Sequence, residues 1–298
     1  MGLPGLTRTA AVVLFAAAAL RAQAGAAAQA PADLTALVNA VGERVASFYE
    51  RAEHLICLNL STVQPIDRNW SGQGFARSVE SELRVELVPT DGDGEPEARV
   101  VRNIQRVNGR QPRESELKSR NGCTDPNPLS PEPLAFLLPS NRDAYRFTSV
   151  RNGRERGRAA LIIDFSSVDR QSRLELIEDE RGHPDCFDWK GPLATRGHVW
   201  IDAQTHDVLR IERGLVGPVD IRVSPKLQRR YHFESYLTLD RDDVTMRFRP
   251  VTFTDPDETL LLPNEIDNVT IVRTGLQSAR RTESFSDYRR FLTTARIK

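Results

Sequence analysis

The sequence predicts a mainly β protein with some helix (α+β). We expect a single curved antiparallel sheet of about ten strands, an incomplete barrel wrapped around an N-terminal helix and a short inserted helix. Three observations predict this fold. A long amphipathic segment at 33–52 comes first, short alternating segments separated by turn residues follow it, and a regular hairpin pattern lies at 197–212. Strict alternation of apolar and polar residues is typical of a strand with one buried face.

The segment 33–52 predicts one amphipathic helix. Asp33 is a good N-cap residue, and apolar residues recur behind it at spacings of three and four. They are Leu34, Leu37, Val38, Val41, Val45, Phe48 and Ala52. Because burying a large apolar side chain contributes roughly 1.5–3 kcal/mol, this face needs an apolar partner, and we expect it to pack against the concave side of the sheet. Its polar face mixes acidic and basic residues, whereas helices that lie on membranes typically have a basic one.

Alternating segments bounded by Gly, Pro, Asn and Asp predict the strands. Before the central hairpin they fall at 54–63, 78–88, 99–107, 145–151 and 159–166. After it they fall at 231–239, 244–248, 259–263, 266–273 and 281–291. Asn152-Gly153 is the predicted turn of one hairpin, and residues 131–138, which begin with proline, predict the inserted helix. Two polar stretches, 110–130 and 167–195, are expected to be long loops, the second with a strand fragment.

The pattern at 197–212 predicts two short strands joined by a polar turn at 203–206. By the strand period of two, one face is aliphatic and the other carries charges around a single tryptophan. The aliphatic face holds Val199, Ile201, Leu209 and Ile211. The opposite face holds His198, Trp200, Asp202, Arg210 and Glu212. We therefore expect this hairpin to lie in an antiparallel sheet that is covered on one side.

Residues 1–24 have the features of a cleaved signal peptide. Arg8 precedes an apolar run at 10–20, and Ala-Gln-Ala at 22–24 matches a signal-peptidase site. The run is too short to cross a bilayer, which takes about 20 residues, and we expect no transmembrane segment in the mature chain. The sequence thus predicts a periplasmic or secreted protein with one half-barrel domain at 25–298.

An exported chain can form disulfides, and this one has three cysteines. Cys123 and Cys186 lie in polar, turn-rich segments, whereas Cys57 lies in an apolar segment and has the features of a buried small side chain. Three pairings are possible. We favour Cys123–Cys186, which would close a loop of roughly 60 residues and contribute roughly 4 kcal/mol.

The charge balance bears on the class of partner. The chain has 41 basic and 41 acidic residues and a formal net charge of zero. Nucleic-acid binding requires a net basic face, so the sequence argues against it. No nucleophile elbow, zinc-protease motif, Cys-x-x-Cys pair or phosphate-binding loop occurs in the chain. We therefore expect a protein that is not an enzyme and has no metal site and no cofactor.

The central hairpin also resembles one found near the middle of periplasmic outer-membrane lipoprotein carriers, in the lipoprotein-sorting superfamily. The resemblance rests on Trp-Ile-Asp at 200–202, a turn that contains threonine, and Leu-Arg-Ile-Glu at 209–212. A long helix followed by an antiparallel meander covers most of the mature chain in the same order, and the ending at 285–291 is similar to those of uncharacterised secreted bacterial proteins. The resemblance implies a half-barrel fold, an envelope location and a hydrophobic ligand. The chain departs from such carriers in its long loops at 110–130 and 167–195.

A carrier of this type would hold a lipid or acyl chain between the concave face of the sheet and the helices. The residues expected to face that space are Leu83, Val85, Leu87, Val199, Ile201, Leu209, Ile211, Phe233, Leu237, Met246 and Phe248. The main alternative is an envelope interaction or sensor module, with a protein partner and an interior filled by its own side chains. A hydrolase whose residues meet only in space is a third interpretation. Cavity-lining and core positions use the same residue types, so the sequence leaves these alternatives open.

Overall fold

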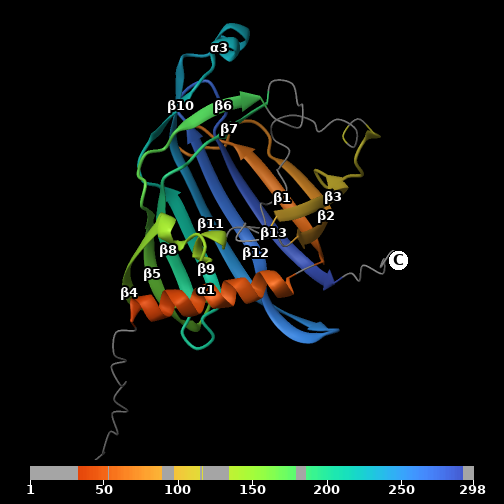
Figure 1. Cartoon of the computed structure of the whole chain (residues 1–298). Helices are drawn as coiled ribbons and strands as arrows, with labels where there is room; N and C mark the ends of the chain where they lie inside the picture. Colours follow the sequence, from red (N-terminus) through yellow and green to blue (C-terminus); the bar gives the residue numbers. More distant parts are fainter. Residues whose placement is uncertain are drawn as a thin grey trace, which may run out of the picture. The chain divides into compact units, whose positions relative to one another are not determined.

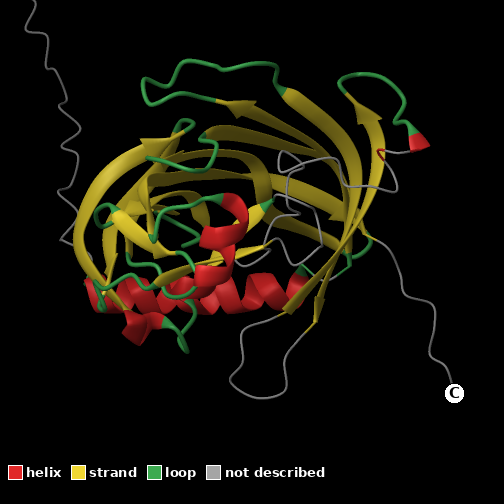
Figure 2. Cartoon of the chain, turned by 90° about the horizontal axis from the view of Figure 1, so that it is seen from above, coloured by secondary structure: helices red, strands yellow, loops and turns green. Residues whose placement is uncertain are grey.

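One 13-stranded sheet organises the chain in the computed structural model. The structure describes residues 33–52, 54–88, 97–114, 116, 134–178 and 186–290. The main path of the sheet runs β3-β2-β1-β13-β12-β11-β9-β8-β5-β4. Its two ends, β3 and β4, are not paired with each other, so the sheet curves without closing (Figures 1 and 2). The predicted fold class, an open half-barrel with an N-terminal helix, is confirmed.

The strands of the main path are all paired antiparallel with their neighbours. They are β1 (Leu55–Pro65), β2 (Arg77–Val88), β3 (Glu97–Val107), β4 (Tyr145–Glu155), β5 (Arg158–Ser167), β8 (Thr195–Asp202), β9 (Val208–Leu215), β11 (Tyr236–Thr254), β12 (Asp257–Val272) and β13 (Ala279–Arg290). Off this path lie β6 (Leu174–Glu178), β7 (Phe187–Lys190) and β10 (Val219–Arg222). The pairing of β6 with β10 is parallel.

Helix α1 (Leu34–Arg51) covers one end of the concave side of the sheet (Figure 1). It begins as predicted, because the carboxylate of Asp33 accepts a hydrogen bond from the backbone N–H of Thr35 at 3.0 Å. Its buried face holds Leu37, Val38, Val41, Gly42, Val45 and Tyr49. Beside it lie the 3₁₀ turns η1 (Ala135–Leu137) and η2 (Arg142–Ala144). The first occupies part of the predicted inserted helix, of which 131–133 lie outside the described residues.

Three hydrophobic clusters lie in the described part of the chain: two large cores and a small cluster of Ile66, Val269 and Ile271. The main core joins α1 and η1 to the concave face of the sheet, from β1 across to β5. The second core joins β6, β10 and the start of β11 to a short helix, α3 (Pro225–Tyr231), at the other end of the long strands (Figure 1). The molecule therefore buries apolar side chains at both ends of its long strands.

The region of α3 corrects the sequence interpretation. The alternation from 231 predicted a strand, but Pro225–Tyr231 is helical and β11 begins at Tyr236. Ser224 accepts a hydrogen bond from the N–H of Leu227, and Pro225 fixes the first helical position. The sequence contains this Ser-Pro signal for the start of a helix, but the alternation of apolar and polar residues after it led to the prediction of a strand.

The β4–β5 hairpin turns later than predicted. Glu155 pairs with Arg158, so Arg156 and Gly157 form the turn, and both have positive φ, as a type I′ turn requires. The predicted turn, Asn152-Gly153, lies inside β4 instead. A Cβ on Gly153 would lie 2.5 Å from Cδ1 of Ile162, so this glycine makes room for a side chain of the neighbouring strand.

Other differences concern strand length and number. Strands β11 and β12 are each continuous where the sequence predicted two segments, because β-bulges absorb the breaks in alternation, such as the one between Arg247 and Phe248. The stretch 167–195 holds β6 and β7, which pair with each other, rather than a fragment and a loop. Strand β10 was not predicted. Most of the predicted loop at 110–130 lies outside the described residues.

Cys57 is buried and free, as predicted, and burial raises the pKa of its thiol to about 12. Cys186 is buried as well. Cys123 lies outside the described residues, as do residues 1–24, so the disulfide and the signal peptide stay predictions.

Candidate functional site

A single row of inward-facing residues crosses the whole concave face. We call it the central row: it has one residue from each strand of the main path, each paired in register with the next. It consists of Val107, Val79, Ser61, Glu283, Ile266, Met246, Ile211, Val199, Ile163 and Val150. From β12 to β4 the row is aliphatic apart from one methionine, and it packs in the main core.

Most of the residues predicted to face the concave side do so. Those buried in the main core are Leu83, Val199, Ile201, Ile211, Met246 and Phe248. Val85 is half-buried and packs against the same core. The hairpin of β8 and β9 is held by Asp202, whose Oδ1 accepts hydrogen bonds from the N–H groups of Gln204 and Thr205, both at 2.9 Å.

Three predicted residues lie elsewhere, and the side chain of a fourth is not described. Leu237 is buried in the second core and Phe233 packs against that core, so neither borders the main one. Leu209 is buried, but it is the extra residue of a β-bulge. Because Ile201 pairs with Val208, Val208 takes the inward position that the sequence pattern gave to Leu209. The side chain of Leu87 lies outside the described residues.

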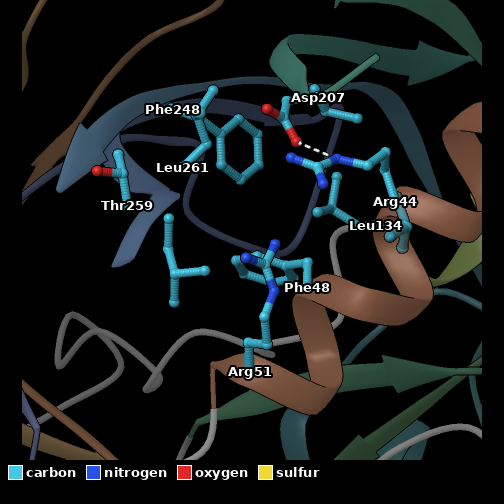
Figure 3. A pocket seen from close by; sticks show the side chains of 11 residues that line it. Arg44, Phe48, Arg51, Leu134, Asp207, Phe248, Thr259 and Leu261 are labelled. Atoms are coloured by element: carbon cyan, nitrogen blue, oxygen red, sulfur yellow. Dashed lines mark hydrogen bonds and ion pairs between the residues drawn. The ribbon is translucent and has the colours of Figure 1, made fainter. Parts of the chain in front are cut away.

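A small pocket lies between α1 and the tip of the β11–β12 hairpin (Figure 3). It is lined by Arg44, Val45, Phe48, Arg51, Leu134, Asp207, Val208, Phe248, Thr259, Leu260 and Leu261. Buried members of the main core form its floor, and charged side chains form its rim. Its water-accessible volume is about 20 Å³, which is room for one or two water molecules. In this conformation the pocket is therefore a nearly closed opening with an apolar floor and a charged rim.

Ion pairs hold α1 over this pocket. Nε of Arg44 donates to Asp207, in the β8–β9 turn, at 2.8 Å, and this hydrogen bond raises the pKa of Arg44 above its ordinary value (Figure 3). At the end of the helix, Arg51 lies 3.4 Å from Glu258 at the start of β12. Glu258 also pairs with Arg290 of β13. Helix α1 is thus tied to the tips of two hairpins, with the apolar pocket between the ties.

A buried polar group interrupts the concave face at β1, β2, β3 and β13. We call it the interior polar group: Asn59, Ser61, Ser81, Arg102 and Glu283. The amide of Asn59 donates to Oε2 of Glu283 at 3.1 Å, and Nε of Arg102 donates to Ser81 at 2.8 Å. Burial raises the pKa of the Glu283 carboxyl above its ordinary value, against the charges of Arg281 and Arg102 and the hydrogen bond from Asn59. The sequence interpretation missed this group, because it took polar residues on strands to face outward.

A larger hollow, with a water-accessible volume of about 640 Å³, lies along β5, β8, β9 and β11. Its wall includes Asp164, which accepts hydrogen bonds from Ser149 at 2.5 Å and Arg151 at 2.6 Å and lies 2.6 Å from Nδ1 of His198. Burial works against ionisation of Asp164, but these hydrogen bonds outweigh it and hold its pKa below the ordinary value. Ser149 and His198 both contact the carboxylate, and none of the hydrogen bonds among the described residues joins one to the other. The three residues therefore do not have the geometry of a catalytic triad, in which the base contacts the nucleophile.

The described ranges contain no group of three or more His, Cys, Asp or Glu side chains placed to bind a metal ion. In the same ranges, none of the helices is long and apolar enough to cross a membrane.

Comparison with known proteins gives only distant likenesses. No family model matches the sequence, and no curated protein matches it. Among solved structures, a LolA superfamily protein from Nitrosomonas europaea is 9% identical with a TM-score of 0.34, over 87% of this chain and 93% of the other. A MucA/MucB complex of Pseudomonas aeruginosa gives 12% identity and a TM-score of 0.22, over 85% and 93%. A second structure, of MucB with MucA(peri), gives 12% and 0.23, over 88% and 100%. Likeness at this level assigns neither a family nor a function.

Proposed function

We propose that this is an exported protein that binds a hydrophobic ligand, a lipid or acyl chain, between the concave face of the sheet and α1, and that it is not an enzyme. The pocket beside α1 carries the proposal, because it connects the apolar main core to the protein surface. Removing an acyl chain from water into such a site is favourable by about 0.8 kcal/mol for each buried CH₂ group. Shielding the chain from water would be the whole of the activity, and release would follow contact with a better acceptor.

Binding of a chain requires the pocket to widen. The present volume of about 20 Å³ is far below the roughly 300 Å³ at which small-molecule sites begin. Ion pairs with partly exposed arginines, Arg44–Asp207 and Arg51–Glu258, link the middle and the end of α1 to the two hairpin tips at this rim. Such pairs typically contribute 1 kcal/mol or less. A ligand therefore has a low-cost route in, beside α1.

Native mass spectrometry of the purified protein tests for a co-purifying lipid, and titration with a fluorescent fatty acid tests for binding. Leu261→Trp places a large side chain in the pocket wall at a half-buried position, so we expect binding to weaken at least ten-fold with little loss of stability. Val101→Trp, at an exposed position on β3, is the matched control and should bind like the parent. Equal binding by both variants would place the ligand elsewhere, and no binding by the parent would refute the proposal.

One observation favours a second candidate function, an envelope interaction module with a self-filled interior. Ile163, Val199 and Ile201 are completely buried by the chain itself. In that case the parent binds no lipid, and the function depends on a protein partner at the surface. The compartment is common to both candidates and rests on the predicted signal peptide at 1–24. It requires a mature N-terminus near residue 25 in the extracytoplasmic fraction, which N-terminal sequencing measures.

A further inference from the structure

The interior polar group occupies a position that packing does not explain. In the central row, Glu283 and Ser61 are direct cross-strand neighbours, with Ile266 on one side and Val79 on the other. Glu283 is only 6% exposed and Ser61 is 0% exposed. Glu283 is the one charged side chain in a row that is otherwise uncharged. A buried ionisable group of this kind is costly unless it is paired and hydrogen-bonded.

The hydrogen bonds within the group leave it incomplete. Within the described residues, Glu283 has a single hydrogen-bond partner, the amide of Asn59 at 3.1 Å. The hydroxyl of Ser61 is buried, and none of the residues that the structure describes forms a hydrogen bond with it. A buried hydroxyl without a partner typically costs about 1–3 kcal/mol. Buried polar groups in native proteins nearly always have hydrogen-bond partners, so the unpartnered Ser61 hydroxyl requires an explanation.

We propose that Ser61, Glu283 and Asn59 bind the hydroxyl-bearing head group of an uncharged amphiphile whose chain lies along the aliphatic part of the central row. This inference rests on the proposed function and adds the chemistry of the ligand to it. The Ser61 hydroxyl can donate and accept a hydrogen bond, and the Glu283 carboxyl, which only Asn59 contacts by a hydrogen bond among the described residues, has lone pairs left to accept another. A ligand hydroxyl complements both.

The surrounding charges select against other head groups. Arg102 and Arg281 both act electrostatically on Glu283, so a cationic amine would meet two positive charges. An anionic carboxylate accepts hydrogen bonds but cannot donate one to the oxygens of Glu283, whereas a hydroxyl can do both. A neutral hydroxyl meets neither penalty.

Four probes with the same oleoyl or oleyl chain test the inference: 1-monooleoylglycerol, methyl oleate, oleate and oleylamine. Each is titrated against the full-length mature protein by displacement of a fluorescent fatty acid. We expect 1-monooleoylglycerol to bind about ten-fold more tightly than methyl oleate, which has the ester and the chain but no hydroxyl. A factor of ten is the typical effect of one hydrogen bond to a buried partner.

Variants at two positions, Ser61 and Glu283, locate the effect. Ser61→Ala should reduce the preference for 1-monooleoylglycerol over methyl oleate to less than three-fold, while methyl oleate binds as it does to the parent. Glu283→Leu should do the same, and Glu283→Gln, which keeps a donor and an acceptor, should retain the preference. Ser284→Ala, at an exposed position on the same strand as Glu283, is the matched control and should behave like the parent. If Glu283→Leu does not fold, Ser61→Ala alone decides.

The outcomes separate this inference from the function it rests on. If the parent binds none of the four probes, the proposed function fails and the inference fails with it. If the parent binds 1-monooleoylglycerol and methyl oleate equally, lipid binding stands and the head-group site is refuted. Tighter binding of oleate or oleylamine than of 1-monooleoylglycerol also overturns it, as does a full preference in Ser61→Ala.

Discussion

The two halves of the concave face have the same backbone geometry and different side chains. From β12 to β4, buried inward positions in the main core are apolar, and they meet the apolar face of α1 and the turn η1. On β13, β1 and β2, inward positions include Glu283, Asn59, Ser61 and Ser81, all buried. We call these the apolar half and the polar half. Both continue the same antiparallel register, so neither strand pairing nor curvature accounts for the difference.

The difference distinguishes side chains that stabilise the fold, in the apolar half, from side chains that folding does not require, in the polar half. Burial of aliphatic side chains stabilises the apolar half, and any ligand there must displace or rearrange a well-packed core. In the polar half, burial removes water from groups that the chain only partly satisfies, which lowers stability. Substitution at equivalent inward positions should therefore have opposite effects in the two halves.

The largest effect is expected in the apolar half. Ile201→Ala removes most of a completely buried side chain next to the central row, and substitutions of this kind typically cost 2–5 kcal/mol. We expect a loss in that range in the free energy of unfolding, measured by urea denaturation. Val101→Ala, where the parent side chain is 63% exposed, should change the value by no more than about 0.5 kcal/mol. A loss below 1 kcal/mol at Ile201 would mean that this half is not a packed core.

Enlarging side chains gives an intermediate effect and distinguishes core from cavity. Ile201→Phe should overpack the apolar half and cost about 1–3 kcal/mol. Val85→Phe, at a half-buried position near the polar half, should cost less than about 1 kcal/mol, because part of the added ring can reach solvent. Thermal unfolding and fatty-acid binding would be measured on both. If Ile201→Phe keeps its stability and loses binding, space for a ligand lies in the apolar half instead.

Much of the apolar half could be predicted from the sequence, because regular alternation determines which side chains share a face. Val199, Ile201 and Ile211 follow from that rule alone. The rule failed at Leu209, since one extra residue in a strand reverses the faces beyond it, and such a bulge leaves no local signal. It also failed at Phe233, where the short helix before β11 removes the residue from the sheet.

The inward orientation of the polar-half residues could have been predicted from strand alternation. It was missed because polar residues on strands were expected to face outward. On β1, the same alternation that turns Leu55 and Cys57 inward also turns Asn59 and Ser61 inward. On β13, Glu283 is two residues from the buried Phe285. The polar residue types predict an outward position, whereas alternation along the strand predicts an inward one. Alternation decides the outcome, because the backbone fixes the face to which each side chain points. Which strand lies beside β1 could not be predicted, since β13 pairs with it from the far end of the sequence.

The pH dependence of stability gives a smaller effect that is specific to the polar half. Burial raises the pKa of Glu283 in the folded state, so between its unfolded pKa, about 4.3, and its folded pKa the folded protein holds the extra proton. Stability contributed in this way is present below pH 4.3 and is lost as pH rises. Glu283→Gln has no such proton, so its stability relative to the parent should increase as pH is raised from 4 to 7. Asp164, whose pKa is lowered, has the opposite trend but is common to both proteins and cancels in the difference. A difference that is constant with pH would show that Glu283 titrates normally.

The smallest effect is also the one that most sharply contrasts with Ile201→Ala. Ser61→Ala removes a completely buried hydroxyl that has no hydrogen-bond partner in the described part of the chain. The described structure therefore loses no hydrogen bond, while the desolvation of that hydroxyl no longer opposes folding. We expect the free energy of unfolding to stay within about 0.5 kcal/mol of the parent or to rise by up to about 1 kcal/mol. Urea denaturation in the absence of lipid measures it, with Ser284→Ala as the exposed control on the strand paired with β1. A loss above 1 kcal/mol would show that the hydroxyl has a stabilising partner, and the polar half would then be an ordinary buried network like those that fix other cores.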